Sequence, residues 1–451
     1  MIINQTVAGG MKITGIIEEY TVMAGKNVSA GDFVQYVNGI GERVVLDPDK
    51  SWSGKWVTAC YYDETHVFVV YCGNNTNGFY CQMISIKDKK VTPGTILQVD
   101  STAYSYFSAA KLCDGKIFVA NCQGYCSSST TGTGYLYGIV ISVDSSYKLT
   151  AGTNKQLSTS YASGYYPKVV VLDSSRVFIA YGYQYTYYYL YGMVVSISGT
   201  SITVQKNKQL STSTYTAPGM DAVLLSSNKI LLIHKSGSSS YKLMSMIVTV
   251  SQYTMTVAST KQLSTTNNSG HYSSCLVLDS SHVFVSCGYG SYAQLMGMVI
   301  SVSGNTVTAG QEVILSDEYY SARVSQAVLI DSSHVFLMCS PRSTSSYQKM
   351  CGLLLTVSTS AITVDKTYDL SDMLTNPSSD SNTADIMKLS SNSAVIVFGY
   401  GQISGYVSAI ALDPANPESG LAPYTSKITG VAKTAGSGGS TVSVFVPGVT
   451  S

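Results

Sequence analysis

An apolar pair that follows a tight polar turn recurs seven times along the chain, and it constrains the fold more than any other feature. The intervals between the first members of successive pairs are 50, 60, 53, 53, 52 and 59 residues. The pairs are Val67-Phe68, Ile117-Phe118, Val177-Phe178, Ile230-Leu231, Val283-Phe284, Val335-Phe336 and, in degraded form, Ala394-Val395. Seven anchors predict seven repeated units, which extend a chain to 451 residues without a new core for each.

The third unit shows how each repeat is built. Segments rich in β-branched and aromatic residues alternate with Ser, Gly and Asp turns, a pattern typical of hairpins. The predicted strands are 169–172, 177–180, 192–197 and 202–204, with tight turns at 173–175 and 198–200. Four antiparallel strands per unit are typical of propeller blades, whereas an immunoglobulin array needs units of about 100 residues. The sequence therefore predicts an all-β fold, a seven-bladed β-propeller inserted in a small terminal β-barrel.

The seventh unit is incomplete, and the start of the chain offers the missing strand. After 407–411 the chain reaches Pro414, Pro417 and Pro423 without a fourth strand. Residues 43–48 include the candidate strand Arg43-Val44-Val45-Leu46, and a strand from the opposite terminus would remove the exposed sheet edges of the ring. We therefore expect the propeller to span 43–423, with 43–48 as its closing strand and 412–423 as a linker.

The two ends, 1–42 and 424–451, are each too small to bury a core, so we expect them to share one β-barrel. Chain direction places the start of the closing strand and the end of 407–411 on the same face of the ring, the face of the tight turns. We therefore expect the barrel beneath that face, with the longer, variable loops turned away from it.

The ends also carry a resemblance to a known class of proteins. The run ITGVAKTAGSGGSTVSVFVPG (428–448), paired with EYTVMAGKNVSAGDFVQYVNG (19–39), resembles the small β-barrel of capsid decoration proteins and related virion proteins of tailed bacteriophages. The Ser- and Tyr-rich line LDSSHVFVSCGYG (278–290) is similar to propellers of phage structural proteins. The resemblance implies a structural protein at the virion surface, made in the host cytoplasm, with capsid or tail proteins as partners. It implies particle docking through the barrel strand of Val442, Val444 and Val446, and the barrel could also support an oligomer.

Tyrosines gather in the long loops of the variable face. Tyr beside Ser and Gly gives rigid amphipathic contact area with adaptable hydrogen bonding, and aromatic rings stack on sugars. The alternative is that Tyr simply suits strands and wet loops. The candidate ligand-binding residues, for cell-surface glycans, are Tyr165, Tyr166, Tyr185, Tyr187, Tyr188 and Tyr189.

Composition excludes several classes of partner. Charged residues make up 12% and the net charge is +1 without a basic cluster, which argues against nucleic acid as a partner. No apolar run approaches the length of about 20 residues that spans a membrane, so we expect no membrane insertion. Nine of the ten cysteines fall at predicted strand positions, and the cysteines are expected to be reduced. Cys122 and Cys126 lack the further ligands of a zinc site, so we expect no metal.

Catalytic signatures are missing from the sequence. His66, His282 and His334 occupy equivalent turns, which favours solvated turn residues over catalysts. No nucleophile elbow, zinc-protease motif or phosphate loop is present, although a pair of catalytic carboxylates is left open. We predict a non-enzymatic protein without a cofactor: a capsid decoration protein whose outward-facing propeller binds glycans or the host surface. The alternatives are a carbohydrate-binding receptor protein of a tail or fibre and, least favoured, a glycoside hydrolase.

Overall fold

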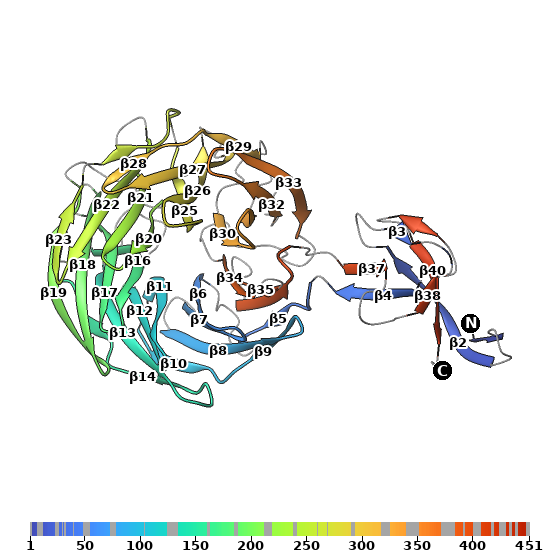
Figure 1. Ribbon diagram of the computed structural model, residues 1–451. Helices are drawn as coiled ribbons and strands as arrows, with labels where there is room; N and C mark the ends of the chain where they lie inside the picture. The colour runs from blue at the N-terminus through green and yellow to red at the C-terminus, as the bar shows by residue number, and fades with distance from the viewer. Residues whose placement is uncertain are drawn as a thin grey trace.

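The computed structural model gives a seven-bladed β-propeller joined to a sheet made from both ends of the chain (Figure 1). It describes residues 2–6, 12–22, 27–28, 30, 33–38, 40–47, 55–72, 78–102, 104–123, 134–159, 163–184, 188–211, 219–237, 241–258, 260–267, 269–289, 294–316, 325–339, 351–370, 384–390, 393–399, 407–415, 419–423, 430–432, 435–437 and 441–447. No helix in this part of the chain is long and apolar enough to cross a membrane.

Blades one to four each begin with their innermost strand (Figure 1). Blade one consists of β6 (Lys55–Asp63), β7 (His66–Cys72), β8 (Phe79–Lys87), β9 (Lys90–Pro93) and β10 (Leu97–Asp100). Blade two consists of β11 (Tyr104–Cys113), β12 (Lys116–Gln123), β13 (Tyr135–Val143), β14 (Leu149–Ala151) and β15 (Lys155–Gln156). Blade three consists of β16 (Ser163–Asp173), β17 (Arg176–Gln184), β18 (Tyr188–Ser198) and β19 (Ser201–Gln209). Blade four consists of β20 (Asp221–Ser226), β21 (Lys229–Lys235), β22 (Leu243–Ser251), β23 (Thr254–Val257) and β24 (Lys261–Gln262).

Blades five to seven complete the ring. Blade five consists of β25 (His271–Val277), β26 (His282–Tyr289), β27 (Gln294–Ser303), β28 (Thr306–Thr308) and β29 (Val313–Ser316). Blade six consists of β30 (Ser325–Leu329), β31 (His334–Cys339), β32 (Cys351–Val357) and β33 (Ile362–Asp369). Blade seven consists of β34 (Ala384–Ser390), β35 (Ser393–Gly399), β36 (Val407–Leu412) and β5 (Val44–Val45) from the start of the chain. β5 pairs with β36 through Val45 opposite Ser408, so the ring closes with a strand from the other terminus.

The anchor pairs build the core because their two members face opposite sides of each blade. Val177 packs with blade two, whereas the adjacent Phe178 packs with blade four, as the alternation of side chains along a strand requires. Every blade repeats this division, which yields seven apolar clusters, one between each pair of neighbouring blades. The predicted all-β, seven-bladed propeller is confirmed.

A recurrent Lys-Gln-Leu-Ser segment at the outer edge of blades two, three and four is hydrogen-bonded to the third strand of its own blade. In blade three Leu210 enters the core, and Ser211 Oγ accepts a 3.1 Å hydrogen bond from Leu190 N at the start of the third strand. Lys208 Nζ donates to the carbonyl of Met255 in blade four at 2.9 Å. The segments at 155–158 and 261–264 place Ser158 and Ser264 on their own third strands in the same way.

The terminal sheet joins the two ends of the chain. Its order is β1 (Ile2–Thr6), β2 (Lys12–Thr21), β40 (Thr441–Pro447), β38 (Gly430–Ala432), β4 (Phe33–Asn38) and β37 (Ser419–Pro423), with β3 (Asn27–Val28) paired to β39 (Gly436–Ser437) beside it. Among the described strands no ladder joins β1 to β37, so a closed barrel and the boundaries 1–42 and 424–451 remain predictions.

Two expectations about this region differ from the structure. The segment 412–423 was expected to be a linker, but Ser419–Pro423 is a strand that pairs along β4. Figure 1 also shows the terminal sheet to one side of the ring, next to blade seven, rather than beneath it. The physical reason is the same for both, since the paired β4 and β37 lead the two ends outward together.

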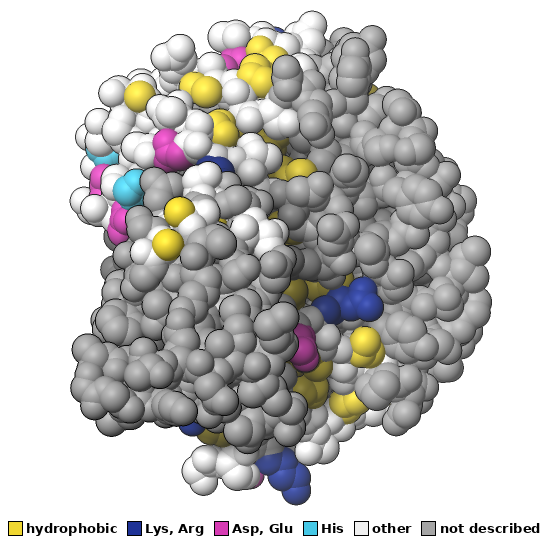
Figure 2. Space-filling model, turned by 90° about the vertical axis from the view of Figure 1, so that its right-hand side faces the viewer, with side chains coloured by type: hydrophobic (Ala, Val, Ile, Leu, Met, Phe, Trp, Pro, Cys, Tyr) yellow, Lys and Arg dark blue, Asp and Glu magenta, His cyan; other side chains and the backbone are white. Residues whose placement is uncertain are grey.

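The surface of the molecule is sparsely charged. Figure 2 looks from the side of the terminal sheet, and the Lys and Arg side chains among the described residues there stand apart from one another. Several basic side chains are instead used between blades: Lys111 Nζ donates to Tyr62 O at 2.8 Å and Lys155 Nζ to Ile202 O at 2.7 Å. These lysines therefore strengthen blade-to-blade contacts.

Candidate functional site

A cavity of about 110 Å³ lies at one end of the central channel. It is lined by the beginnings of the innermost strands, and all seven blades contribute. Because each innermost strand begins where the chain crosses over from the preceding blade, the cavity opens on the face of the long, variable loops. The lining residues include Trp56, Thr58, Tyr106, Tyr166, Lys168, Tyr272, Gln326 and Asp385.

Seven polar residues, one from each blade, occupy the same register in the innermost strands. Each pairs with the residue that lies two positions after the second member of its blade's anchor pair; for example, Lys168 pairs with Ala180 and Asp385 with Val397. We call this set the polar ring: Thr58, Ser108, Lys168, Asp221, Ser274, Gln326 and Asp385.

Side chains of the polar ring accept hydrogen bonds from the next blade around the channel. Asp385 Oδ2 accepts from Ala59 N at 3.2 Å, Ser108 Oγ from Val169 N at 3.0 Å and Asp221 Oδ2 from Cys275 N at 2.9 Å. Each innermost strand is a sheet edge whose N–H groups lack a strand partner on the channel side. These three side chains therefore satisfy N–H groups of the innermost strands and connect neighbouring blades.

Three members of the polar ring carry charge. Lys168 Nζ lies 3.2 Å from Asp221 Oδ1, which makes an ion pair between blades three and four. Burial alone would lower the pKa of Lys168, but the carboxylates of Asp221 and Asp385 outweigh it and raise that pKa above its usual value. Burial also raises the pKa of Asp385 to about 6, against the lowering effect of the N–H of Ala59 and the charge of Lys168. With all three ionised, the polar ring has a net charge of −1.

Four aromatic residues stand at the cavity, each two positions before a member of the polar ring. Trp56, Tyr106, Tyr166 and Tyr272 have φ of 59°, 51°, 47° and 50°. Their strands carry register shifts here, so a β-bulge in each redirects the aromatic side chain. Such a backbone costs of order 1–3 kcal/mol per residue and is concentrated at functional sites. We call these four residues the aromatic rim.

Three rings of the aromatic rim lie against one another. The ring of Tyr106 is 4.1 Å from that of Trp56 and 4.2 Å from that of Tyr166, measured between centroids. Trp56 and Tyr166 come from blades one and three, yet their centroids are only 6.4 Å apart. The three side chains therefore converge beside the polar ring and present aromatic surface to whatever occupies the cavity.

The tyrosines proposed from the sequence as ligand-binding residues differ in position and exposure. Tyr166 belongs to the aromatic rim, whereas Tyr165 is only 7% exposed, so its side chain does not point into solvent. The bulge between Tyr165 and Lys168 turns neighbouring residues to different surroundings. Tyr189 is half-buried at the start of β18, where the side chain of Tyr188 is not described, and Tyr185 and Tyr187 lie outside the described residues. A ligand-binding role for this loop remains a prediction.

The proposed docking strand lies inside the terminal sheet. β40 runs between β2 and β38, and Val444 pairs with Glu18 on one side and Ala432 on the other. Val444 is fully buried, so its side chain supports the sheet instead of presenting a surface. The side chains of Val442 and Val446 are not described. Docking through this strand remains a prediction.

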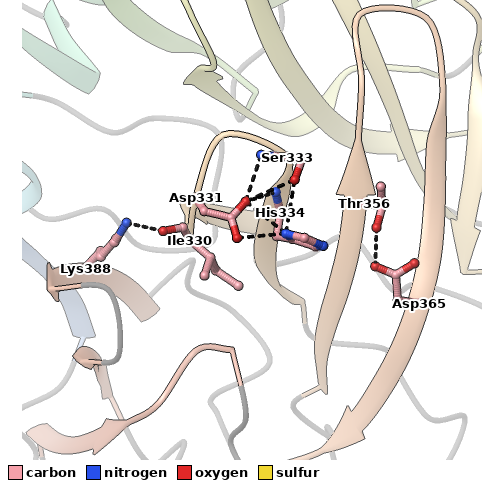
Figure 3. A network of polar contacts seen from close by, with 7 residues as sticks. All are labelled: Ile330, Asp331, Ser333, His334, Thr356, Asp365 and Lys388. Atoms are coloured by element: carbon pink, nitrogen blue, oxygen red, sulfur yellow. Dashed lines mark hydrogen bonds and ion pairs between the residues drawn. The ribbon is translucent and has the colours of Figure 1, made fainter.

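The repeated histidines begin the second strands of their blades, at the opposite end of the innermost strands from the cavity. Figure 3 shows Asp331 accepting hydrogen bonds from the backbone of Ser333 at 2.8 Å and from His334 Nδ1 at 2.8 Å. His66 and His282 pair with Asp63 and Asp279 in the same way. Within the described ranges, no three His, Cys, Asp or Glu residues are grouped to hold a metal ion. The nine described cysteines are free thiols, and Cys126 lies outside the described residues.

Comparison with known proteins gives only distant structural similarities. No protein-family model and no curated protein matches the sequence. Similar solved structures include a protein of unknown function from Dyadobacter fermentans (10% identity, 86% of this chain and 100% of that one, TM-score 0.42). The six-bladed fucose-binding lectin of the fungus Aleuria aurantia is 11% identical over 70% of this chain and 95% of its own, with a TM-score of 0.41. The sialidase NanB of Streptococcus pneumoniae is 12% identical over 82% of this chain and 70% of its own, with a TM-score of 0.44.

The aromatic residues of the cavity stand at a constant distance in sequence from the anchor pairs. Trp56, Tyr106 and Tyr272 stand 12 residues before the second member of their anchor pairs, Phe68, Phe118 and Phe284. Tyr166 has the same spacing from Phe178, so an alignment of the repeats on these phenylalanines would have found the aromatic rim.

Proposed function

We propose that this protein is a non-enzymatic binding protein whose central cavity takes a small polar group of a larger ligand. The observation that carries the proposal is that four members of the polar ring line the same cavity as the aromatic rim, a cavity to which all seven blades contribute. These four are Thr58, Lys168, Gln326 and Asp385. Ligand sites combine aromatic walls with a few placed polar groups. A cavity of about 110 Å³ is small, so it holds one head group while the rest of the ligand lies across the variable face.

The ligand class we propose is a glycan of a cell surface. Aromatic rings beside hydrogen-bonding side chains suit the alternating apolar and polar faces of sugars. The terminal sheet, which resembles barrels of phage virion proteins in sequence, would attach the propeller to a capsid as a decoration protein. Attachment to a tail or fibre, as a receptor-binding protein, uses the same cavity and differs only in the partner of the terminal sheet.

Binding to an immobilised set of cell-surface glycans tests this function. Wild-type protein should bind a subset saturably, and Tyr106→Ala should abolish that binding because it opens the centre of the aromatic rim. Tyr61→Ala is the matched control, since Tyr61 is 41% exposed at the opposite end of β6. Absence of saturable binding to any glycan, or equal loss in both variants, would refute the proposal.

One observation favours a hydrolase as the second candidate. A carboxyl group with a pKa of about 6 in a cavity, as at Asp385, is a suitable general acid. Such an enzyme needs a second carboxylate across the scissile bond, and Asp221 is instead held by Lys168 and by Cys275 N. Release of a chromophore from nitrophenyl glycosides by wild-type protein, lost in Asp385→Asn, would establish the hydrolase and displace the binding function.

A further inference from the structure

We propose that the head group taken by the cavity is an ammonium group, as in an amino sugar or a choline substituent, held between Asp385 and the aromatic rim. This inference rests on the proposed function, because it specifies the chemistry of the ligand at the same site. It starts from the charge of the polar ring and from the geometry of the rings above it.

The only cation of the polar ring is already paired. Lys168 Nζ lies 3.2 Å from Asp221 Oδ1, and that carboxylate also accepts from Cys275 N through its other oxygen. An anionic ligand would therefore have to compete with Asp221 for Lys168 and would enter a ring with a net charge of −1. A cationic ligand meets the opposite situation, because it brings the charge that the ring lacks.

Asp385 is the carboxylate that a cation would meet. Its hydrogen-bond donors are neutral: Thr58 Oγ1 donates to Oδ2 at 3.0 Å, Ala59 N to Oδ2 at 3.2 Å and Ile386 N to Oδ1 at 3.0 Å. These groups orient the carboxylate but supply no full positive charge. Lys168 is close enough to lower the pKa of Asp385, yet burial still holds that pKa at about 6.

The other charged or titratable groups around Asp385 come from neighbouring strands. Asp221 on β20 is committed to its ion pair with Lys168 on β16. The thiols of Cys60 on β6 and Cys275 on β25 have pKa values raised by burial, and nearby carboxylates raise them further. The described ring residue of β30 is Gln326, which does not titrate. Proton uptake in the cavity between pH 5 and 7 is therefore assigned to Asp385.

The aromatic rim supplies the second half of an ammonium site. Cations bind over aromatic faces within about 6 Å of the ring centroid, and cages of several rings favour quaternary ammonium groups. Trp56, Tyr106 and Tyr166 lie 4.1–6.4 Å from one another, and all three line the same cavity as Asp385. Stacking on a neutral sugar uses the same rings, so the charge of the ligand must be tested directly.

Choline and its neutral carbon isostere, 3,3-dimethylbutan-1-ol, form the decisive pair of probes, read by the fluorescence of Trp56. Choline should bind at least tenfold more tightly than the isostere at pH 7. Because the cation prefers ionised Asp385, choline affinity should fall about tenfold from pH 7 to pH 5, as linkage to a pKa of about 6 requires. Glucosamine, compared with N-acetylglucosamine, shows whether a primary ammonium group on a sugar is bound. Glucosamine compared with choline shows whether a primary or a quaternary ammonium group is preferred.

Two variants test whether Asp385 causes the preference for choline and the pH dependence of choline binding. Asp385→Asn should remove both the preference for choline over the isostere and the pH dependence. Asp365→Asn is the matched control, because Asp365 accepts from Thr356 on the outer strands of blade six, away from the channel, and it should leave both unchanged (Figure 3).

The outcomes separate this inference from the proposed function. Rim-dependent glycan binding without a preference for choline or glucosamine would overturn the inference and leave the function standing. Acetate binding that strengthens toward pH 5 would overturn it in favour of an anion. Loss of glycan, choline and glucosamine binding alike would overturn both.

Discussion

A methyl group added at Gly192 tests how tightly the blades are packed. A Cβ there would lie 2.8 Å from Phe178 Cε2 and 3.0 and 3.1 Å from the two terminal methyl carbons of Leu210. Carbon atoms ordinarily contact at about 3.5–4.0 Å, so both side chains would have to withdraw by roughly 0.5–1 Å. Phe178 is 0% exposed and Leu210 7%, which leaves no space for that movement.

The free energy of unfolding should fall by about 1–2 kcal/mol in Gly192→Ala. Overpacking of a filled core costs about 1–3 kcal/mol. Replacing Gly within a strand recovers about 0.5–1 kcal/mol because the unfolded chain loses freedom. Equilibrium urea unfolding followed by circular dichroism measures the difference.

A double-mutant cycle identifies the cause. Phe178→Leu shortens the side chain that the new methyl group meets, so it should destabilise the Gly192→Ala protein less than it destabilises wild type, with a coupling of at least 0.5 kcal/mol. Gly199→Ala is the control, because a Cβ there meets no atom within 4 Å and its cost comes from a φ of +63°. Wild-type stability in Gly192→Ala, or equal coupling of Phe178→Leu to both glycine variants, would refute the packing argument.

Three further predictions concern the propeller outside the cavity. Lys208→Met should lower the unfolding free energy by about 1 kcal/mol through loss of its hydrogen bond to Met255 O, whereas Lys206→Met should not; urea unfolding measures both. The pKa values of Asp279 and Asp331 are held at about 2, chiefly by backbone N–H donors, so their stabilisation is present above pH 4 and lost toward pH 2. Replacing both with Asn should flatten the acid limb of a stability–pH profile. Denaturing titration without reductant should count ten free thiols, and eight or fewer would show that a disulfide forms.

The blades could be predicted because their signal is local and repeated. In blades one, three, five and six the anchor pair follows a turn whose Asp accepts backbone hydrogen bonds, as Asp173 does from Ser175 N at 2.9 Å. Both members of the pair must be apolar because they enter two different cores. Apolar residues therefore recur at these positions even where other positions of the repeat vary. The degraded pair Ala394-Val395 still fits, since both side chains are fully buried.

The cavity was not predicted because its residues occupy equivalent positions in different blades but differ in chemical type. Lys168, Asp221 and Gln326 are unlike in sequence, and only the pairing register shows that they are equivalent. The positive φ of Trp56 could not be inferred from its residue type, because bulky residues rarely adopt it. The strand Ser419–Pro423 was hidden for another reason: its partner β4 lies almost 400 positions earlier, as in Gly420 opposite Val37.

Asp385 lets the candidate site be tested through stability alone, without a ligand. Its pKa is raised to about 6 in the folded protein, whereas a carboxyl group in the unfolded chain titrates near 3.8. Below about pH 4 both states carry the proton and Asp385 has no effect. Between about pH 4 and 6 only the unfolded state releases it, so stability falls as pH rises, which is opposite in sign to the turn aspartates.

Above about pH 6 this loss is complete, and two pKa units correspond to about 3 kcal/mol at most, less because water reaches the cavity. Asp385→Asn keeps an oxygen that can accept from Ala59 N but cannot ionise. The variant should therefore unfold at higher urea than wild type at pH 7 and at the same urea at pH 4. A site retained at a cost in stability is what a binding role for Asp385 requires. Equal stability of the two proteins at pH 7 would show that this carboxylate is not strained by burial, and the ammonium site would lose its electrostatic basis.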